Sequence, residues 1–281
     1  MNYFLDEEKT WLQRDFNLDR RLIKALSKLG YIYPTLIQSK CIPIIVQGKD
    51  VLVRAKTGSG KTIAFSLPIL QKILIQKENQ SSTTTSSIKC IILAPTKELV
   101  KQIEKHITDL IYYCREIITI CSLNDDNLTT QRYRLQMKPD IIISTPSKLI
   151  SNLKQIQQHH SSSSSSGNVN DDNNNNNILD LSSVTTLILD EADLILSFGY
   201  TDDIHSILTK LSKNFQGILM SATLSAELDK FKKITLHQPV LIKLEESKDT
   251  MINLLQFYLN CIEKDKYLIL YVFMKLGLLQ V

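Results

Sequence analysis

Three carboxylates stand together in the tetrapeptide Asp190-Glu191-Ala192-Asp193, directly after the apolar and β-branched run 184–189. Such a run predicts a strand that is buried on both faces of a parallel sheet. At its end, Asp190 could hold a magnesium ion through water, while Glu191 could orient or deprotonate an attacking water. This pairing would serve phosphoryl transfer, which requires positioning and charge compensation more than covalent chemistry. The alternative is a strand-end carboxylate that caps the following helix, a role that suits Asp193.

A phosphate-binding loop is predicted upstream, where residues 55–62 read AKTGSGKT. The loop lies between a predicted strand over 50–54 and a predicted helix whose apolar period runs over 62–76. Backbone N–H groups must point inward at an anion here, and Gly58 and Gly60 permit that bend because they tolerate positive φ. The alternative, a Gly-Ser turn followed by a chance Lys-Thr pair, is disfavoured by the acidic strand downstream.

Two side chains at the end of the loop complete a predicted nucleotide site. Lys61 would reach the β- and γ-phosphates of ATP, and the Thr62 hydroxyl would ligate Mg²⁺ together with Asp190. The predicted phosphate-binding residues are Ala55, Lys56, Thr57, Gly58, Ser59, Gly60, Lys61 and Thr62.

Four further segments accompany this loop and the tetrapeptide. They are 30–38 (GYIYPTLIQ), 95–99 (PTKEL), 145–148 (TPSK) and 221–223 (SAT). With these six motifs in order, the chain resembles the DEAD-box RNA helicases from about Leu18 onward, apart from two polar inserts. The resemblance implies an α/β fold, namely a RecA-like P-loop NTPase domain with helices on both faces of a parallel sheet. It also implies an ATP-dependent RNA helicase, an enzyme with RNA-stimulated ATPase activity.

The first of these segments resembles the adenine-reading Q motif of the family. A glutamine amide carries both an acceptor and a donor, so Gln38 can read N6 and N7 of adenine and reject guanine. Tyr31 and the rigid Pro34 are expected to border the base. A P-loop kinase or a small GTPase is disfavoured, because Gln38 and the acidic tetrapeptide both favour an ATP-driven helicase.

The segments 95–99 and 145–148 resemble the family's motifs Ia and Ib. Each follows a predicted strand at a predicted helix N-terminus, where backbone N–H groups and nearby cations bind phosphate without reading base sequence. A solvated surface lysine is the alternative for Lys97 or Lys148 taken alone. The residues assigned to RNA are Pro95, Thr96, Lys97, Thr145, Pro146 and Lys148.

The segment 221–223 resembles the family's motif III. The hydroxyls of Ser221 and Thr223 are expected to bridge to Asp193 and so to relay the state of the nucleotide to a partner domain. A plain helix N-cap at Ser221 or Thr223 is the alternative. The predicted catalytic set is Lys61, Asp190, Glu191, Asp193, Ser221 and Thr223.

The chain departs from the family pattern at several positions. Gln13 stands where the family has an aromatic residue, with Trp11 and Phe16 nearby but out of register. Motif Ia has Lys97 in place of arginine, and lysine offers a point charge in place of a bidentate fork. The Gly-Gly pair expected within 117–136 is missing.

The segment 96–99 (TKEL), the missing Gly-Gly pair and the segment 236–240 (LHQPV) resemble one branch of the family. That branch comprises the nucleolar DEAD-box helicases that act in assembly of the large ribosomal subunit. The resemblance implies pre-ribosomal RNA as the partner, bound through its backbone, and the nucleus and nucleolus as the location.

Composition is compatible with this reading. The 281 residues are 43% hydrophobic and 22% charged, with a net charge of +4, which is a weak pointer to nucleic acid. The five cysteines form no C-x-x-C pair, which predicts reduced core residues of an intracellular protein. The acidic start predicts no signal peptide. The apolar segment 267–281 is too short for a membrane span.

Three parts are predicted along the chain: 1–48 with the Q motif, 49–246 as the RecA-like ATP-binding domain, and 247–281 as a linker and the start of a second domain. Polar inserts at about 80–87 and 158–177 are expected to be disordered surface loops. The predicted strands are 50–54, 88–94, 116–121, 140–144, 184–190, 216–220 and 239–244. The predicted helices are 19–28, 62–76, 96–112, 127–137, 146–157, 201–212, 225–234 and 263–277.

The family places ATP and RNA between two RecA-like domains, and only the beginning of the second is recognised here. An arginine finger is worth ~10³–10⁵ in rate, so this chain alone is expected to hydrolyse ATP very slowly. The alternative, from another class, is a truncated non-catalytic module that binds ATP, RNA or an assembly partner without unwinding.

Overall fold

The structure is a computed structural model that describes residues 5–6, 9–13, 16–79, 87–124, 128–153, 180–223, 226–244 and 258–277. The chain divides into two compact units, Met1–Leu244 and Glu245–Val281. The predicted insert at 158–177 lies outside the described residues, and so does the insert at 80–87 except for its last residue.

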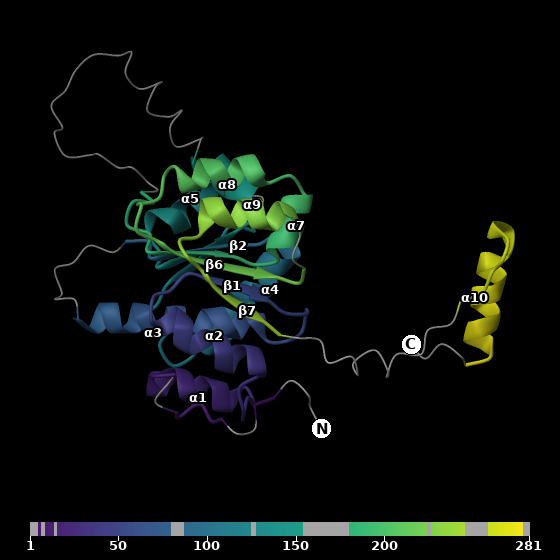
Figure 1. The fold of residues 1–281 in the computed structure, drawn as a ribbon, viewed down its shortest axis with the longest axis horizontal. Coiled ribbons are helices and arrows are strands. Elements are labelled where there is room, and N and C mark those ends of the chain that lie inside the picture. Colours follow the sequence, from purple (N-terminus) through teal and green to yellow (C-terminus); the bar gives the residue numbers. More distant parts are fainter. Residues whose placement is uncertain are drawn as a thin grey trace, which may run out of the picture. The chain divides into compact units, whose positions relative to one another are not determined.

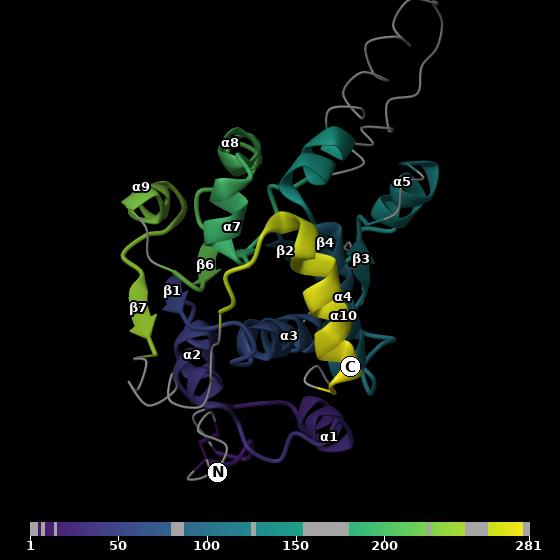
Figure 2. The same ribbon diagram turned by 90° about the vertical axis from the view of Figure 1, so that its right-hand side faces the viewer.

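A seven-stranded sheet forms the centre of the first unit (Figures 1 and 2). The strands lie in the order β3-β4-β2-β5-β6-β1-β7, and all neighbours pair in parallel. They are β1 (Val51–Arg54), β2 (Cys90–Leu93), β3 (Ile120–Ser122), β4 (Ile141–Ser144), β5 (Thr186–Leu189), β6 (Gln216–Ser221) and β7 (Val240–Lys243). The fold class is therefore confirmed as a parallel α/β sheet.

Helices cover both faces of this sheet (Figure 1). On one face pack α1 (Arg20–Lys28), α2 (Leu36–Val46), α3 (Lys61–Asn79) and α4 (Lys97–Leu110). On the other pack α5 (Leu128–Gln136), the helical residues 146–153, α7 (Ala192–Ser197), α8 (Thr201–Leu208) and α9 (Ala226–Thr235). The sheet thus lies between two helical layers.

Alternate residues of the inner strands enter different cores. In β2, Cys90 and Ile92 pack with the α1–α4 layer, while Ile91 and Leu93 pack with the α7–α9 layer. All four are buried. A strand enclosed in this way needs apolar side chains on both faces, which explains why its sequence is a continuous apolar run instead of an alternating one.

All seven predicted strands are present, but two helices are not among the predictions. Helix α2 contains Pro43, and its segment was interpreted only as a ligand-reading motif. A capping box between Thr35 and Gln38 begins this helix and was the available signal. Helix α7 has only six residues and no side-chain hydrogen bond at its N-cap, Glu191, so the sequence carries little signal for it.

The second unit is described over residues 258–277. It contains a 3₁₀ turn, η2 (Glu263–Asp265), followed by α10 (Lys266–Lys275). A helix was predicted at 263–277, and α10 lies within that range.

A buried carboxylate joins three elements at the amino edge of the sheet. Oδ2 of Asp140, directly before β4, accepts hydrogen bonds from Lys77 Nζ at 2.7 Å and from the Thr119 N–H at 2.8 Å. The Thr119 hydroxyl donates to the same oxygen at 2.9 Å. Lys77 lies in α3 and Thr119 directly precedes β3, so this carboxylate ties a helix to two strands.

Replacing Asp140 with alanine should lower the free energy of unfolding by about 2 kcal/mol, because it removes three hydrogen bonds that join α3, β3 and β4, while Lys77 is half-buried and Thr119 exposed, so that their donors can turn to water. Urea unfolding followed by circular dichroism measures the effect. Glu116→Ala is the matched control, since Glu116 is exposed. Equal stability of the two variants would show that the Asp140 network contributes little.

Candidate functional site

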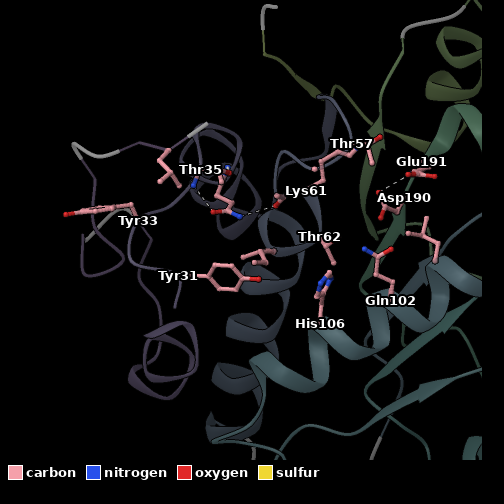
Figure 3. A pocket seen from close by; sticks show the side chains of 16 residues that line it. Tyr31, Tyr33, Thr35, Thr57, Lys61, Thr62, Gln102, His106, Asp190 and Glu191 are labelled. Carbon is pink, nitrogen blue, oxygen red and sulfur yellow. Dashed lines mark hydrogen bonds between the residues drawn. The ribbon is translucent and has the colours of Figure 1, made fainter. Parts of the chain in front are cut away.

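A cavity of about 370 Å³ opens beside the loop that joins β1 to α3 (Figure 3). It lies at the carboxyl ends of the strands, where open α/β sheets bind their ligands. Its lining comes from segments far apart in the sequence: Leu5, Tyr31, Tyr33, Thr35, Gln38, Thr57, Gly58, Gly60, Lys61, Thr62, Ile63, Leu99, Gln102, His106, Asp190 and Glu191.

The loop after β1 bends as its glycines suggest. Gly58 has a φ of 81° and Gly60 a φ of 92°, both in the left-handed region. Helix α3 begins at Lys61, so its free N–H groups and the positive end of its dipole lie at the loop. The Lys61 side chain is buried, and its Nζ donates to the Ala55 carbonyl at 3.0 Å. The loop therefore presents an anion site with one buried cation.

Helix α2 holds this loop from the side. The Gln38 amide accepts a hydrogen bond from the Thr35 N–H at 2.8 Å and donates to the Gly60 carbonyl at 3.2 Å. The Thr35 hydroxyl donates to the Ser59 carbonyl at 2.9 Å. We call these three bonds the α2–loop clamp. Gln38 still has a second N–H and a second lone pair, so it can also face a ligand.

The two carboxylates predicted to act on phosphate both line the cavity. Burial raises the pKa of the Asp190 carboxyl to about 6, with Lys61 opposing this shift and Glu191 adding to it. Oδ1 of Asp190 accepts a hydrogen bond from the Glu191 N–H at 3.1 Å. A nearby cation would favour the ionised form of such a group.

Glu191 has an unusual backbone for a residue with a side chain. Its φ of 52° and ψ of 53° lie in the left-handed region, where residues other than glycine are uncommon. It is the N-cap of α7 but makes no capping hydrogen bond, so the capping alternative is wrong for this carboxylate. Strained residues cluster at functional sites, which agrees with a position in the cavity wall.

The third carboxylate of the tetrapeptide pairs with the segment after β6. The Thr223 hydroxyl donates to Asp193 Oδ2 at 2.9 Å, and the Thr223 N–H donates to the same oxygen at 3.0 Å. The expectation for Ser221 is wrong in its contact, because its hydroxyl donates at 2.7 Å to the Thr223 carbonyl instead of to Asp193. Ser221 therefore supports the turn that presents Thr223.

The residues assigned to RNA lie at the carboxyl ends of β2 and β4, which are adjacent strands. Thr96 is the N-cap of α4, and its hydroxyl accepts from the Leu99 N–H at 3.2 Å. Lys97 is exposed and Lys148 half-buried, while the other three, Pro95, Thr145 and Pro146, are buried. Lys97 is therefore the most accessible of this set, and Thr96 and Lys148 are both half-buried.

Four of the predicted nucleotide-binding residues do not line the cavity: Pro34, Ala55, Lys56 and Ser59. Pro34 is buried, and its neighbours Tyr33 and Thr35 form that wall instead.

Seven lining residues were absent from the predicted site: Leu5, Tyr33, Thr35, Ile63, Leu99, Gln102 and His106. Leu5 lies beside the Q motif because it forms an antiparallel β-bridge with Thr35. Gln102 and His106 are one turn apart on α4, and this i, i+4 spacing was the only available signal.

The clamp generates a test at the two loop glycines. A Cβ atom at Gly60 would lie 2.5 Å from Gln38 Nε2, whereas one at Gly58 would meet no atom within 4 Å. Both positions have positive φ, so alanine strains the backbone in either case. Gly60→Ala should weaken ATP binding clearly more than Gly58→Ala, since it also displaces the Gln38 amide. Calorimetric titration measures both; equal losses would count against the clamp.

The part of the chain that the structure describes has neither a membrane-spanning helix nor a cluster of metal-ligating side chains. No helix there is long and apolar enough to span a membrane. The same residues contain no group of three or more His, Cys, Asp or Glu side chains suited to a metal ion.

Comparison with known proteins agrees with this geometry. Residues 35–231 match the DEAD/DEAH box helicase family. The chain is 40% identical over 266 residues to the "Probable ATP-dependent RNA helicase ddx56" of Dictyostelium discoideum, covering 94% of this chain and 35% of that protein. It is 38% identical over 282 residues to the ATP-dependent RNA helicase DBP9 of Debaryomyces hansenii, covering 99% of this chain and 44% of that one.

Solved structures agree as well. The yeast DEAD-box splicing factor Prp28 has a TM-score of 0.69 at 28% identity, over 84% of this chain and 52% of that one. A DEAD box protein from Methanococcus jannaschii has a TM-score of 0.65 at 26% identity, over 92% of this chain and 62% of that one. Since the family match covers well over half of its residues, the chain belongs to the DEAD/DEAH box helicases.

Proposed function

We propose that this chain is the ATP-binding half of an ATP-dependent RNA helicase, which couples ATP binding and hydrolysis to remodelling of RNA duplexes. The observation that carries the proposal is the cavity in which Gln38, Lys61, Asp190 and Glu191 meet. An amide, a buried cation and two carboxylates are the groups that an adenine, a triphosphate and an attacking water require.

Adenine is proposed to bind at Gln38. The amide still has one N–H and one lone pair beyond those used in the α2–loop clamp, which suits N7 and the N6 amino group of adenine. Tyr31 lines the same cavity as Gln38. The base would thus be read by a residue that also fixes the phosphate loop.

The phosphates are proposed to bind the loop and Lys61. This requires Lys61 Nζ to exchange its bond to the Ala55 carbonyl for a phosphate oxygen. Glu191 is proposed to orient the attacking water and accept its proton. The Asp193–Thr223 pair is proposed to report the state of the nucleotide to a second domain.

A magnesium ion fits the donor set of this cavity. Asp190 and Thr62 supply oxygen ligands, and Mg²⁺ uses one or two protein ligands while keeping much of its water. Burial raises the pKa of the Asp190 carboxyl, and a bound cation would lower it again by favouring the ionised form. When bound, the ion would neutralise charge on the phosphates; Asp190 and Thr62 would hold it.

RNA is proposed to bind at the ends of β2 and β4 through the residues assigned above, with Lys97 and Lys148 providing accessible charge. Such contacts go to phosphates, so affinity should not depend on base sequence. The narrower proposal, ribosome biogenesis on pre-ribosomal RNA in the nucleolus, rests on the resemblance of segments 96–99 and 236–240 to the nucleolar branch of the family.

The chain spans 35–44% of the length of these two relatives. We propose the division 1–48, 49–246 and 247–281, in which the last part leads into a second RecA-like domain. Hydrolysis would then require that domain, since closure excludes water and completes the catalytic set. The alternative remains a non-catalytic module that binds ATP or RNA.

Nucleotide choice tests the adenine site. The chain should bind ATP or ADP well above GTP, and Gln38→Ala should weaken ATP at least several-fold, because a bidentate contact is worth about 1–3 kcal/mol. Calorimetric titration of the three nucleotides measures both effects. Equal affinity of the unmutated chain for ATP and GTP would refute the assignment.

Catalysis is tested in a longer chain that includes the second domain. Glu191→Gln keeps the side-chain size but removes the base, so it should spare ATP binding and abolish RNA-stimulated phosphate release. Lys61→Ala should instead weaken binding itself. Turnover of the Glu191→Gln enzyme at the parental rate would exclude the proposed role. Robust RNA-stimulated turnover by residues 1–281 alone would show that no second domain is needed.

A further inference from the structure

One polar atom in the cavity wall has no assigned role. His106 lies on α4, and its side chain lines the cavity one helical turn after Gln102. Its Nδ1 atom is buried and has no hydrogen-bond partner among the described residues. Buried polar atoms in proteins are nearly always paired, so an unpaired one at the wall of a cavity indicates a ligand.

The position of His106 indicates which part of a nucleotide it would meet. This inference depends on the proposed function, in which the base binds near Gln38 and the phosphates bind near Lys61. Figure 3 shows the imidazole directed toward Thr62, with the hydroxyl of Tyr31 across from it. His106 thus faces both Tyr31, which is proposed to border the base, and Thr62, which follows the phosphate loop, and the part of a nucleotide between base and phosphates is the sugar.

The chemistry of imidazole agrees with a sugar hydroxyl. Neutral imidazole has one donor and one acceptor nitrogen, and a hydroxyl can donate and accept. A hydroxyl therefore pairs with Nδ1 in either tautomer, whereas a phosphate oxygen can only accept. Rotating the imidazole by half a turn about its Cβ–Cγ bond moves Nδ1 from one side of the ring to the other, so that Nδ1 can face the cavity. The Tyr31 hydroxyl offers a second partner on the opposite side.

We propose that His106 binds a ribose hydroxyl of the nucleotide and makes the chain prefer ribonucleotides to deoxyribonucleotides. Neither the phosphate loop nor the Q motif supplies this contact. It comes from α4, whose first residues belong to the proposed RNA-binding segment.

The test is a set of titrations of the 281-residue chain with ADP, 2′-deoxy-ADP and 3′-deoxy-ADP. The unmutated chain should bind ADP about three- to tenfold more tightly than at least one deoxy analogue, as expected for one hydrogen bond. His106→Leu should bind ADP about three- to tenfold more weakly and lose the preference.

Two variants serve as controls. His106→Asn keeps a polar atom near the position of Nδ1 and should keep most of the preference. His205→Leu replaces an exposed histidine on α8, on the other face of the sheet, and should behave like the unmutated chain. Thermal unfolding of each variant identifies any that fails to fold.

The outcomes separate this inference from the proposed function. If the unmutated chain binds ADP and both deoxy analogues equally, the inference is overturned whatever the variants do. It is also overturned if folded His106→Leu keeps the full preference; in both cases the nucleotide site stands. If no adenine nucleotide binds the unmutated chain, the proposed function itself fails.

Discussion

The parallel direction of all seven strands is the constraint on which the rest of the molecule depends. Because every carboxyl end lies at one edge, the segments that follow five of the strands meet there. Along this edge, the two RNA-assigned segments follow β4 and β2, the acidic tetrapeptide follows β5, motif III follows β6, and the phosphate loop follows β1. The tetrapeptide thus lies at the boundary between the proposed RNA half and the nucleotide half.

Buried carboxylates at the two edges of the sheet differ in the hydrogen bonds that they accept. At the amino edge, Asp140 accepts bonds from Lys77 and Thr119, and Asp50 accepts from the Gly217 and His237 N–H groups at 2.9 and 2.6 Å. Each of these carboxylates accepts at least two hydrogen bonds and holds elements together. Asp190, at the carboxyl edge, has a single neighbouring backbone donor and a raised pKa. A carboxylate left short of donors is suited to an external cation.

The sequence predicted the strands well because continuous apolar runs have few other interpretations in a chain of this composition. It also predicted Gly58 and Gly60 correctly as positive-φ positions. The sequence did not predict features that depend on contacts between residues far apart in the chain. The clamp between Gln38 and Gly60 joins residues 22 positions apart, and the cavity role of His106 depends on how α4 packs. The prediction that Ser221 bonds to Asp193 was wrong because a hydroxyl has several partners within reach, and the spacing of residues in the sequence does not select one of them.

The strand order also fixes when the parts can assemble. The only described neighbours of β1 are β6 and β7, which lie more than 160 residues later in the sequence. During synthesis the phosphate-loop strand therefore emerges long before either partner exists, and its unpaired edges stay open throughout. A growing chain with such an edge is prone to pair with other molecules. The same strand order that brings the proposed nucleotide site together thus leaves the strand before the phosphate loop without partners in the nascent chain until β6 and β7 have been made.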